Sequence, residues 1–313
     1  VHLHNLHSSY ADLGVISYFA ANKIPVVQTL HDCWSFTGHC GHFFGCTRWQ
    51  TGCGKCPNLL VYPSIRFDAT RLNWLRKRRV YCDARPCLVT PSYWLKSQVK
   101  HSFLHELRCE HISNGVDTTR FVPASQSNAR AQLHLPQDRT ILLYVANQGL
   151  NSTTFKDPDL AVNSLRELIY EHNYTNVLLV VVGGVATVPE DLAQFIVQYE
   201  FTTSALEVFY QAADILLYLS KADNCPLVML EALSCGLPVI CTDVGGCAEL
   251  IESGTTGYVV HPNDNAAVVS KILSLVQRNR EQLSVNTRSK AVELYSLSNM
   301  ASSYLSLYRN LTS

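Results

Sequence analysis

The sequence predicts an α/β protein with two doubly wound domains joined by a linker. Short apolar runs alternate with helical segments over residues 1–122 and again over residues 138–295, as expected for parallel strands covered by helices. Between these regions, residues 123–137 are polar and aperiodic, which is typical of a linker. The 313 residues, 47% of them hydrophobic and 16% charged, are enough to bury the cores of two domains.

The first domain shows the rhythm of a βαβ unit. We expect a strand at 1–4, a helix at 11–21, a strand at 25–30, a Cys-rich loop at 33–57, a basic helix at 72–81, a strand at 87–90, a helix that Ser92 caps and a strand at 109–112. The chain opens in a strand rather than in a leader segment. We therefore expect the start of this domain to be missing.

The second domain repeats the alternation with stronger strands. We expect strands at 140–145, 176–182, 214–219, 238–241 and 257–260, and an amphipathic helix at 264–277. The apolar run at 177–182 is far shorter than the roughly 20 residues that span a bilayer. In the last segment, 296–313, Met300, Tyr304, Leu307 and Tyr308 share one face of a predicted helix, 297–311, so this helix must pack on something.

The balance of charge argues against nucleic acid as a partner. Lys plus Arg and Asp plus Glu both total 25, so no global field favours a polyanion. One local segment is basic, residues 72–80, and it also carries Trp74 and Leu75. This helix could rest on an anionic membrane, which would make the protein a peripheral one, or it could simply be solvated.

Two carboxylates follow the predicted strand 214–219. Asp223 lies in the loop after the carboxyl end of this strand, and Glu231 lies on the helix at 226–234 that follows. Open parallel sheets bind nucleotides at such strand ends, where a carboxylate can accept hydrogen bonds from ribose or sugar hydroxyls. Alternatively, Asp223 caps the helix and Glu231 is a solvated carboxylate.

Four cysteines form a cluster in the loop at 33–57. They are Cys40, Cys46, Cys53 and Cys56, separated by five, six and two residues. The C-x2-C pair with two further thiols suits a structural zinc ion, because the loop has few apolar residues with which to fold. Reduced thiols or two disulfides are the alternatives.

Several motifs resemble the family 4 retaining glycosyltransferases over nearly the whole chain. They are Thr29-Leu30-His31-Asp32, Thr90-Pro91-Ser92, Ser113-Asn114-Gly115-Val116-Asp117, the segment from Glu231 to Ile240, and Gly245-Gly246-Cys247-Ala248-Glu249-Leu250-Ile251. The segments from Leu30 to Cys40 and from Ala222 to Asn224 look most like the bacterial exopolysaccharide branch, similar to the colanic acid transferases. The resemblance implies the GT-B fold, in which two Rossmann-like domains face a cleft and the last helix crosses back to the first.

The resemblance also implies roles for residues of the second domain. Glu231 would bind the ribose hydroxyls and Asp223 the transferred sugar, and Lys156 would bind the diphosphate and stabilise its developing charge. The family pattern Arg-Lys-Gly reads Phe155-Lys156-Asp157 here, so Lys156 is the cation that remains. The other expected donor-binding residues are Asn224, Cys225, Pro226, Leu227, Gly245 and Gly246.

In the first domain, the resemblance implies that His31 contacts the donor sugar or the acceptor and that Asp32 orients it. A structural hydrogen bond is the alternative for His31. We assign no catalytic base, because the departing diphosphate can take the proton of the acceptor hydroxyl. No cofactor is then required for catalysis.

The resemblance therefore implies a retaining enzyme that moves a sugar from a nucleotide-diphosphate donor to a polysaccharide or lipid-linked acceptor. We expect it in the cytoplasm, in part at the inner face of the membrane. A catalytically silent sugar-nucleotide-binding or scaffold protein is the alternative, because one basic residue is replaced and the start of the first domain is absent.

Overall fold

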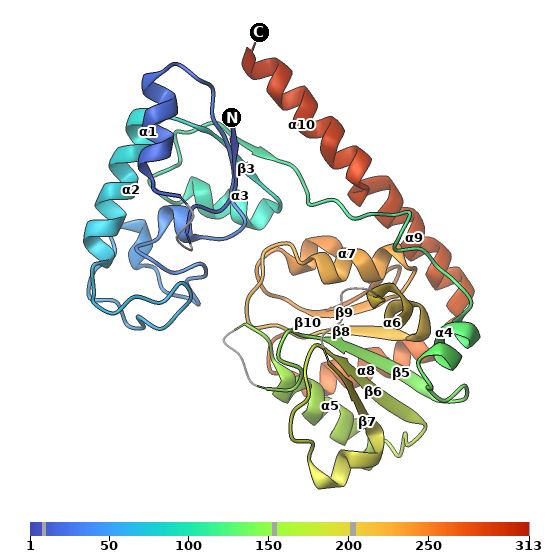
Figure 1. The fold of residues 1–313 in the computed structure, drawn as a ribbon. Coiled ribbons are helices and arrows are strands. Elements are labelled where there is room, and N and C mark those ends of the chain that lie inside the picture. The colour runs from blue at the N-terminus through green and yellow to red at the C-terminus, as the bar shows by residue number, and fades with distance from the viewer. Residues whose placement is uncertain (8–10, 152–154, 201–204, 313) are drawn as a thin grey trace. The chain divides into compact units, whose positions relative to one another are not determined.

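The computed structural model describes the chain except residues 8–10, 152–154, 201–204 and 313 (Figure 1). The described residues form two compact units. Unit 1 comprises residues 1–113 and 301–313, and unit 2 comprises residues 114–300. Each unit contains one parallel sheet with helices against it, so the predicted α/β fold class with two Rossmann-like units is confirmed.

Unit 1 is built on a sheet of order β1-β2-β3-β4. Its strands are β1 (His2–Leu3), β2 (Val27–Thr29), β3 (Cys87–Thr90) and β4 (Cys109–His111), and its helices are α1 (Gly14–Ala21), α2 (Thr70–Ala84) and α3 (Tyr93–Lys100), with the 3-10 helices η1 (Trp34–Phe36) and η2 (Arg48–Gln50). The predicted cap of α3 is confirmed, because Ser92 Oγ accepts a hydrogen bond from Leu95 N at 3.1 Å.

Unit 2 is built on a sheet of order β10-β9-β8-β5-β6-β7. Its strands are β5 (Thr140–Val145), β6 (Val177–Val182), β7 (Ile196–Tyr199), β8 (Ile215–Tyr218), β9 (Val239–Thr242) and β10 (Gly257–Val260). Its helices are α4 (Gln126–Gln132), α5 (Pro158–Tyr170), α6 (Leu206–Ala212), α7 (Leu227–Ser234), α8 (Asn265–Val276) and α9 (Arg280–Tyr295), with η3 (Glu190–Phe195) and η4 (Cys247–Leu250). Two buried clusters, one on each face of the sheet, form its core.

The segment predicted as a linker is partly helical. Ser125 caps α4 by accepting from Asn128 N at 3.4 Å, and Arg130 on this helix is only 4% exposed. The helix is held by a buried polar side chain rather than by an apolar stripe, which is why hydrophobic periodicity did not reveal it. Residues 123–137 accordingly lie within unit 2.

The last helix, α10 (Leu297–Thr312), packs through the face that the sequence predicts. Its residues from 301 onward belong to unit 1, where Tyr304 Oη lies 2.7 Å from Thr29 Oγ1 and Tyr308 Oη lies 2.6 Å from His2 Nδ1. Leu307 on the same face is buried. None of the helices in the described part of the chain has the length and apolar character needed to cross a membrane.

Candidate functional site

The site in unit 2 lies at the point in the sheet where the order of successive strands changes direction. The chain runs outward from β5 to β6 and β7 and then returns to β8 on the other side of β5. In open α/β sheets, ligands bind at such a switch point, beyond the carboxyl ends of the strands. Lys156 follows β5 and Asp223 follows β8, so the two predicted residues come from the two strands that flank this point.

Lys156 is brought into the site by a short bridge between the two loops. It pairs with Ser220 in an antiparallel bridge, and the backbone carbonyl of Phe155 accepts from Lys221 N at 2.7 Å. The Lys156 side chain is 20% exposed, and its Nζ lies 3.6 Å from Asp223 Oδ2. Burial lowers the pKa of Lys156, and the charge of Asp223 opposes this shift.

Asp157, the neighbour of Lys156, is engaged by the local structure. Its buried side chain caps α5 by accepting from Leu160 N at 3.3 Å, and Lys221 Nζ lies 4.0 Å from it. The next residue is Pro158, which has no amide hydrogen. The Asp157 carboxylate is thus engaged at the amino terminus of α5.

Asp223 is held by three contacts. Its Oδ1 accepts from Asn224 N at 2.7 Å, and its Oδ2 accepts from the Tyr218 hydroxyl in addition to facing Lys156. The Tyr218 hydroxyl also contacts Lys156 Nζ. Tyr218 was missed by sequence reasoning, since an aromatic residue at the end of a buried strand reads as core.

Glu231 is placed on α7 with one oxygen fixed. Its Oε2 accepts from Tyr210 Oη at 2.7 Å, and Tyr210 on α6 is only 1% exposed. Burial raises the pKa of Glu231, while the Tyr210 hydroxyl and the more distant Arg120 lower it. The N-cap position of α7 is occupied by Pro226, and no side chain accepts a capping hydrogen bond there. Asp223 is therefore not the cap of this helix.

The other predicted donor-binding residues surround the backbone of Asp223. Gly245 has a φ of +55°, and a Cβ there would lie 1.7 Å from the Asp223 carbonyl oxygen. Gly246 N donates to the same oxygen at 3.4 Å. The remaining residues form the loop into α7, where Asn224, Cys225 and Pro226 are buried and Leu227 is 52% exposed.

In unit 1, Asp32 contacts a histidine that was not predicted. Asp32 Oδ2 lies 2.7 Å from His7 Nε2, and its Oδ1 accepts from Trp34 N at 2.9 Å. His31 Nε2 lies 2.9 Å from His4 Nδ1, and burial together with the neighbouring His4 lowers the pKa of His31. His7 was missed because its separation from Asp32 in sequence gives no local signal.

The prediction of a zinc ion at the Cys-rich loop is not supported. Cys40, Cys46, Cys53 and Cys56 are free thiols around one small cavity, yet within the described residues no group of three or more His, Cys, Asp or Glu side chains is placed to hold a metal ion. Cys53 Sγ accepts from Gly38 N at 3.2 Å, and Cys56 Sγ donates to Asn58 O at 3.4 Å. Two of the four thiols, those of Cys53 and Cys56, thus form hydrogen bonds with nearby backbone groups.

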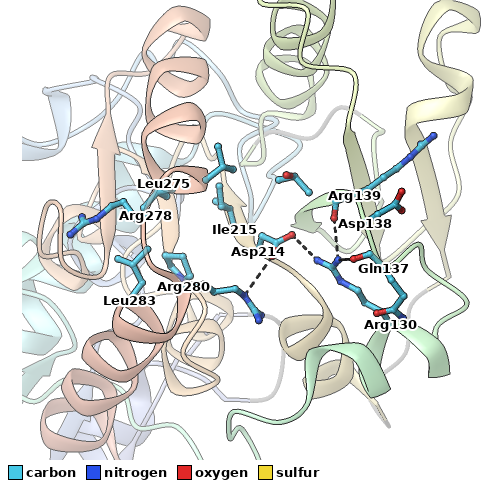
Figure 2. Close-up of a pocket in the computed structure, with 13 residues that line it drawn as sticks. Arg130, Gln137, Asp138, Arg139, Asp214, Ile215, Leu275, Arg278, Arg280 and Leu283 are labelled. Carbon is cyan, nitrogen blue, oxygen red and sulfur yellow. Dashed lines mark hydrogen bonds and ion pairs between the residues drawn. The ribbon is translucent and has the colours of Figure 1, made fainter.

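A separate cavity of about 210 Å³ lies at the opposite, amino-terminal edge of the sheet of unit 2 (Figure 2). Arg130 and Arg280 converge on Asp214, whose Oδ2 accepts from Arg130 Nη2 and from Ile141 N, both at 2.7 Å. Arg130 also donates to the carbonyls of Ala212, Gln137 and Arg139. These partners satisfy one another, so the network holds α4 and α9 to the sheet.

Residues 139–278 match the family model described as Glycosyl transferases group 1. The Escherichia coli (strain K12) protein WcaC, named as a colanic acid biosynthesis glycosyl transferase, is 27% identical over 99% of this chain and 76% of its own length. A D-inositol 3-phosphate glycosyltransferase of Geodermatophilus obscurus is 30% identical over 93% of this chain and 63% of its own length. Matches to other enzymes of that name cover 40–44% of their length, so this chain spans less than half of them.

Solved structures share the fold. Sucrose-phosphate synthase of Thermosynechococcus elongatus superposes with a TM-score of 0.69 at 20% identity, over 99% of this chain and 73% of that one. Anabaena HepE in complex with UDP superposes with a TM-score of 0.70 at 16% identity, over 96% of this chain and 76% of that one. With the family match, these likenesses confirm the GT-B fold, and residues 139–278 of this chain form a group 1 glycosyl transferase domain.

Proposed function

We propose that this chain transfers a sugar from a nucleoside diphosphate sugar to a glycan or lipid-linked acceptor, with retention of the anomeric configuration. The pairing of Lys156 with Asp223 beside the switch point of the sheet, 3.6 Å apart, carries this proposal. It offers a cation to a diphosphate and a carboxylate to sugar hydroxyls within one site. HepE, which shares the fold, has been solved with UDP and with UDP-glucose, which supports a donor of this class.

In the proposed reaction, Lys156 stabilises the leaving group. The diphosphate gains negative charge as the bond between its oxygen and the anomeric carbon of the sugar breaks, and a fixed cation favours that change. Lys156 and not a cofactor supplies this charge in the proposal. Because Lys156 is largely shielded from water, its field is screened less than that of a surface lysine.

The remaining groups of unit 2 bind the two ends of the donor. Glu231, with one oxygen fixed by Tyr210, accepts hydrogen bonds from the ribose hydroxyls, and Asp223 accepts them from the sugar. An acceptor hydroxyl forms the new bond to the anomeric carbon on the face that the diphosphate leaves, and a departing phosphate oxygen takes its proton. No protein nucleophile is needed in this scheme, and His31 in unit 1 contacts the sugar or the acceptor.

A calorimetric screen of UDP-, GDP- and ADP-sugars tests this proposal, followed by a transfer assay with the donor that binds. We expect one nucleotide class to bind and Glu231→Gln to weaken its binding by at least about 10-fold, the value of hydrogen bonds to a charged group. The control is Glu252→Gln, which removes an exposed carboxylate that pairs with Lys290. Equal effects of the two variants, or binding without any transfer, would contradict the proposal.

We also propose that unit 1 contacts an anionic membrane surface where a lipid-linked acceptor lies. The predicted basic face is partly buried, because Trp74 is 5% and Lys77 is 2% exposed. Exposed apolar side chains in and near this segment are Leu60 at 82%, Phe67 at 81%, Leu72 at 71% and the predicted Leu75 at 42%. Such large apolar side chains cost free energy in water and gain it in the interfacial layer of a membrane.

Charge complementarity favours a membrane as the partner of this surface. Arg66, Arg71 and Arg78 are exposed in the same segment, and each basic residue near an anionic leaflet contributes about 1 kcal/mol. Co-sedimentation with phosphatidylglycerol vesicles should therefore exceed that with phosphatidylcholine vesicles, and the double change Leu60→Ser with Phe67→Ser should reduce it. If the double variant sediments as the unchanged chain does, this surface does not contact the membrane.

A further inference from the structure

Tyr218 stands out among the groups of the site because it is not part of the predicted set. It is the last residue of β8 and is only 3% exposed, so its ring is held by the core while its hydroxyl reaches the site. That hydroxyl contacts both Lys156 Nζ and Asp223 Oδ2. Lys156 Nζ also lies 3.7 Å from the centroid of the Tyr218 ring.

The direction of the hydrogen bonds follows from the protonation of the phenol. Burial raises the pKa of Tyr218 well above its ordinary value, and the Asp223 carboxylate raises it further, so the phenol keeps its proton at neutral pH. The hydroxyl therefore donates to Asp223, and its oxygen accepts from the Lys156 ammonium group. The three groups form an ordered chain from cation through phenol to anion.

This chain has a consequence for a diphosphate that approaches Lys156. In the described arrangement the counterion of Lys156 is Asp223, at 3.6 Å. An incoming diphosphate competes with Asp223 for the same ammonium group. When it displaces Asp223, the carboxylate keeps the Tyr218 hydroxyl and Asn224 N, at 2.7 Å, as its remaining partners.

We infer that Tyr218 is a positioning residue that holds Asp223 in place for the transferred sugar while the diphosphate of the donor replaces Asp223 on Lys156. The inference rests on the proposed function, because it needs a nucleoside diphosphate sugar in this site. It predicts that Tyr218 contributes to the binding of the sugar part of the donor more than to the binding of the nucleotide part. It also predicts that Tyr218 acts through Asp223.

The test compares Tyr218→Phe, Asp223→Asn and the double variant in the full chain by calorimetry. The two ligands are the nucleotide sugar that the screen selects and its free nucleoside diphosphate. Tyr218→Phe should weaken binding of the nucleotide sugar about 10-fold, as expected for the loss of a hydrogen bond to a charged group. It should weaken binding of the free nucleoside diphosphate less than about 3-fold. In the double variant the loss should not exceed that of Asp223→Asn alone.

Tyr144→Phe is the matched control. Tyr144 lies on the neighbouring strand β5 and is 1% exposed, and within the described residues its hydroxyl has no hydrogen-bond partner. This change should leave both affinities unaltered, while unchanged thermal melts show that each variant is folded.

The outcomes separate the two proposals. If the unchanged chain binds no nucleotide sugar, the proposed function fails. If it binds one, and Tyr218→Phe weakens both ligands equally, has no effect, or adds its full loss to that of Asp223→Asn, the positioning role alone fails.

Discussion

Replacing Lys156 by Met removes the cation of the site while keeping a side chain of similar length. Two opposite unit charges 3.6 Å apart, the distance between Lys156 Nζ and Asp223 Oδ2, attract each other by about 4–5 kcal/mol at an effective dielectric constant of about 20. A diphosphate must displace Asp223 to gain this energy, so the net contribution to binding is smaller. The reaction rate depends on the part of the interaction that strengthens as the diphosphate leaves. A single group that stabilises developing charge in this way raises the rate by on the order of 10²–10³-fold.

We therefore expect Lys156→Met to lower kcat/KM for the donor by about 10²–10³-fold in a transfer assay that follows release of the nucleoside diphosphate. Lys221→Met is the control. Lys221 lies in the loop that also carries Asp223, its side chain is 38% exposed, and its Nζ lies 4.0 Å from Asp157 Oδ1. Because the Lys221 ammonium group is exposed to solvent and only at the 4.0 Å limit of an ion pair, its loss should change kcat/KM only a few-fold. Comparable losses in the two variants would refute the role of Lys156.

Three further outcomes are expected. Gly245→Ala should abolish donor binding, because the new Cβ would lie 1.7 Å from a backbone carbonyl oxygen. Gly254→Ala is the control, because φ is also positive there but the new Cβ would lie 3.8 Å from the nearest atom, and donor binding should be retained. Calorimetry compares the two variants, and equal donor affinities would contradict the close packing at Gly245. Burial raises the pKa of Glu231 and binding needs its carboxylate form, so donor affinity should fall on acidification at a higher pH than for an ordinary glutamate. Tyr210→Phe removes a hydrogen bond that lowers this pKa and should move the fall in affinity to a still higher pH. An unchanged pH profile of donor affinity would argue against the role of Glu231 in donor binding. Arg130→Met should destabilise unit 2 by about 1.5–3 kcal/mol, since it removes a hydrogen bond between charged groups that Arg280 and Ile141 N replace only in part at Asp214. The Tm should fall by roughly 3–12 °C, and a shift below about 2 °C would show that the network at the amino edge is not structural.

The strands and the donor loops could be predicted because their signals are local. The strands at 140–145, 87–90 and 257–260 have the predicted bounds, since a buried parallel strand is a continuous apolar run in the sequence. Lys156 and Asp223 follow such runs, and parallel strands bring their carboxyl ends to one edge of a sheet. The ion pair between them is consistent with the roles that the resemblance implies.

The contacts that link distant residues could not be predicted. Tyr218 and Tyr210 have the aromatic side chains of ordinary core positions, and only the tertiary structure shows that their hydroxyls meet Asp223 and Glu231. The pairing of Asp32 with His7 spans 25 residues, so no local pattern in the sequence indicates it. The segment of helix α4 is predicted as a linker because its sequence lacks an apolar stripe. The side chain that fixes it is the buried Arg130, and arginine is a residue type that is mostly exposed in proteins.

The central claim is that a nucleoside diphosphate sugar binds at the carboxyl edge of the sheet of unit 2. Hydrogen–deuterium exchange with and without the selected donor tests it directly, because amides that a ligand contacts or orders exchange more slowly. We expect protection of residues 155–160, 223–227 and 245–246, with no change at residues 137–141 and 278–283 around the cavity of the opposite edge. Protection at that cavity, with no change in the three segments beside Lys156 and Asp223, would contradict it.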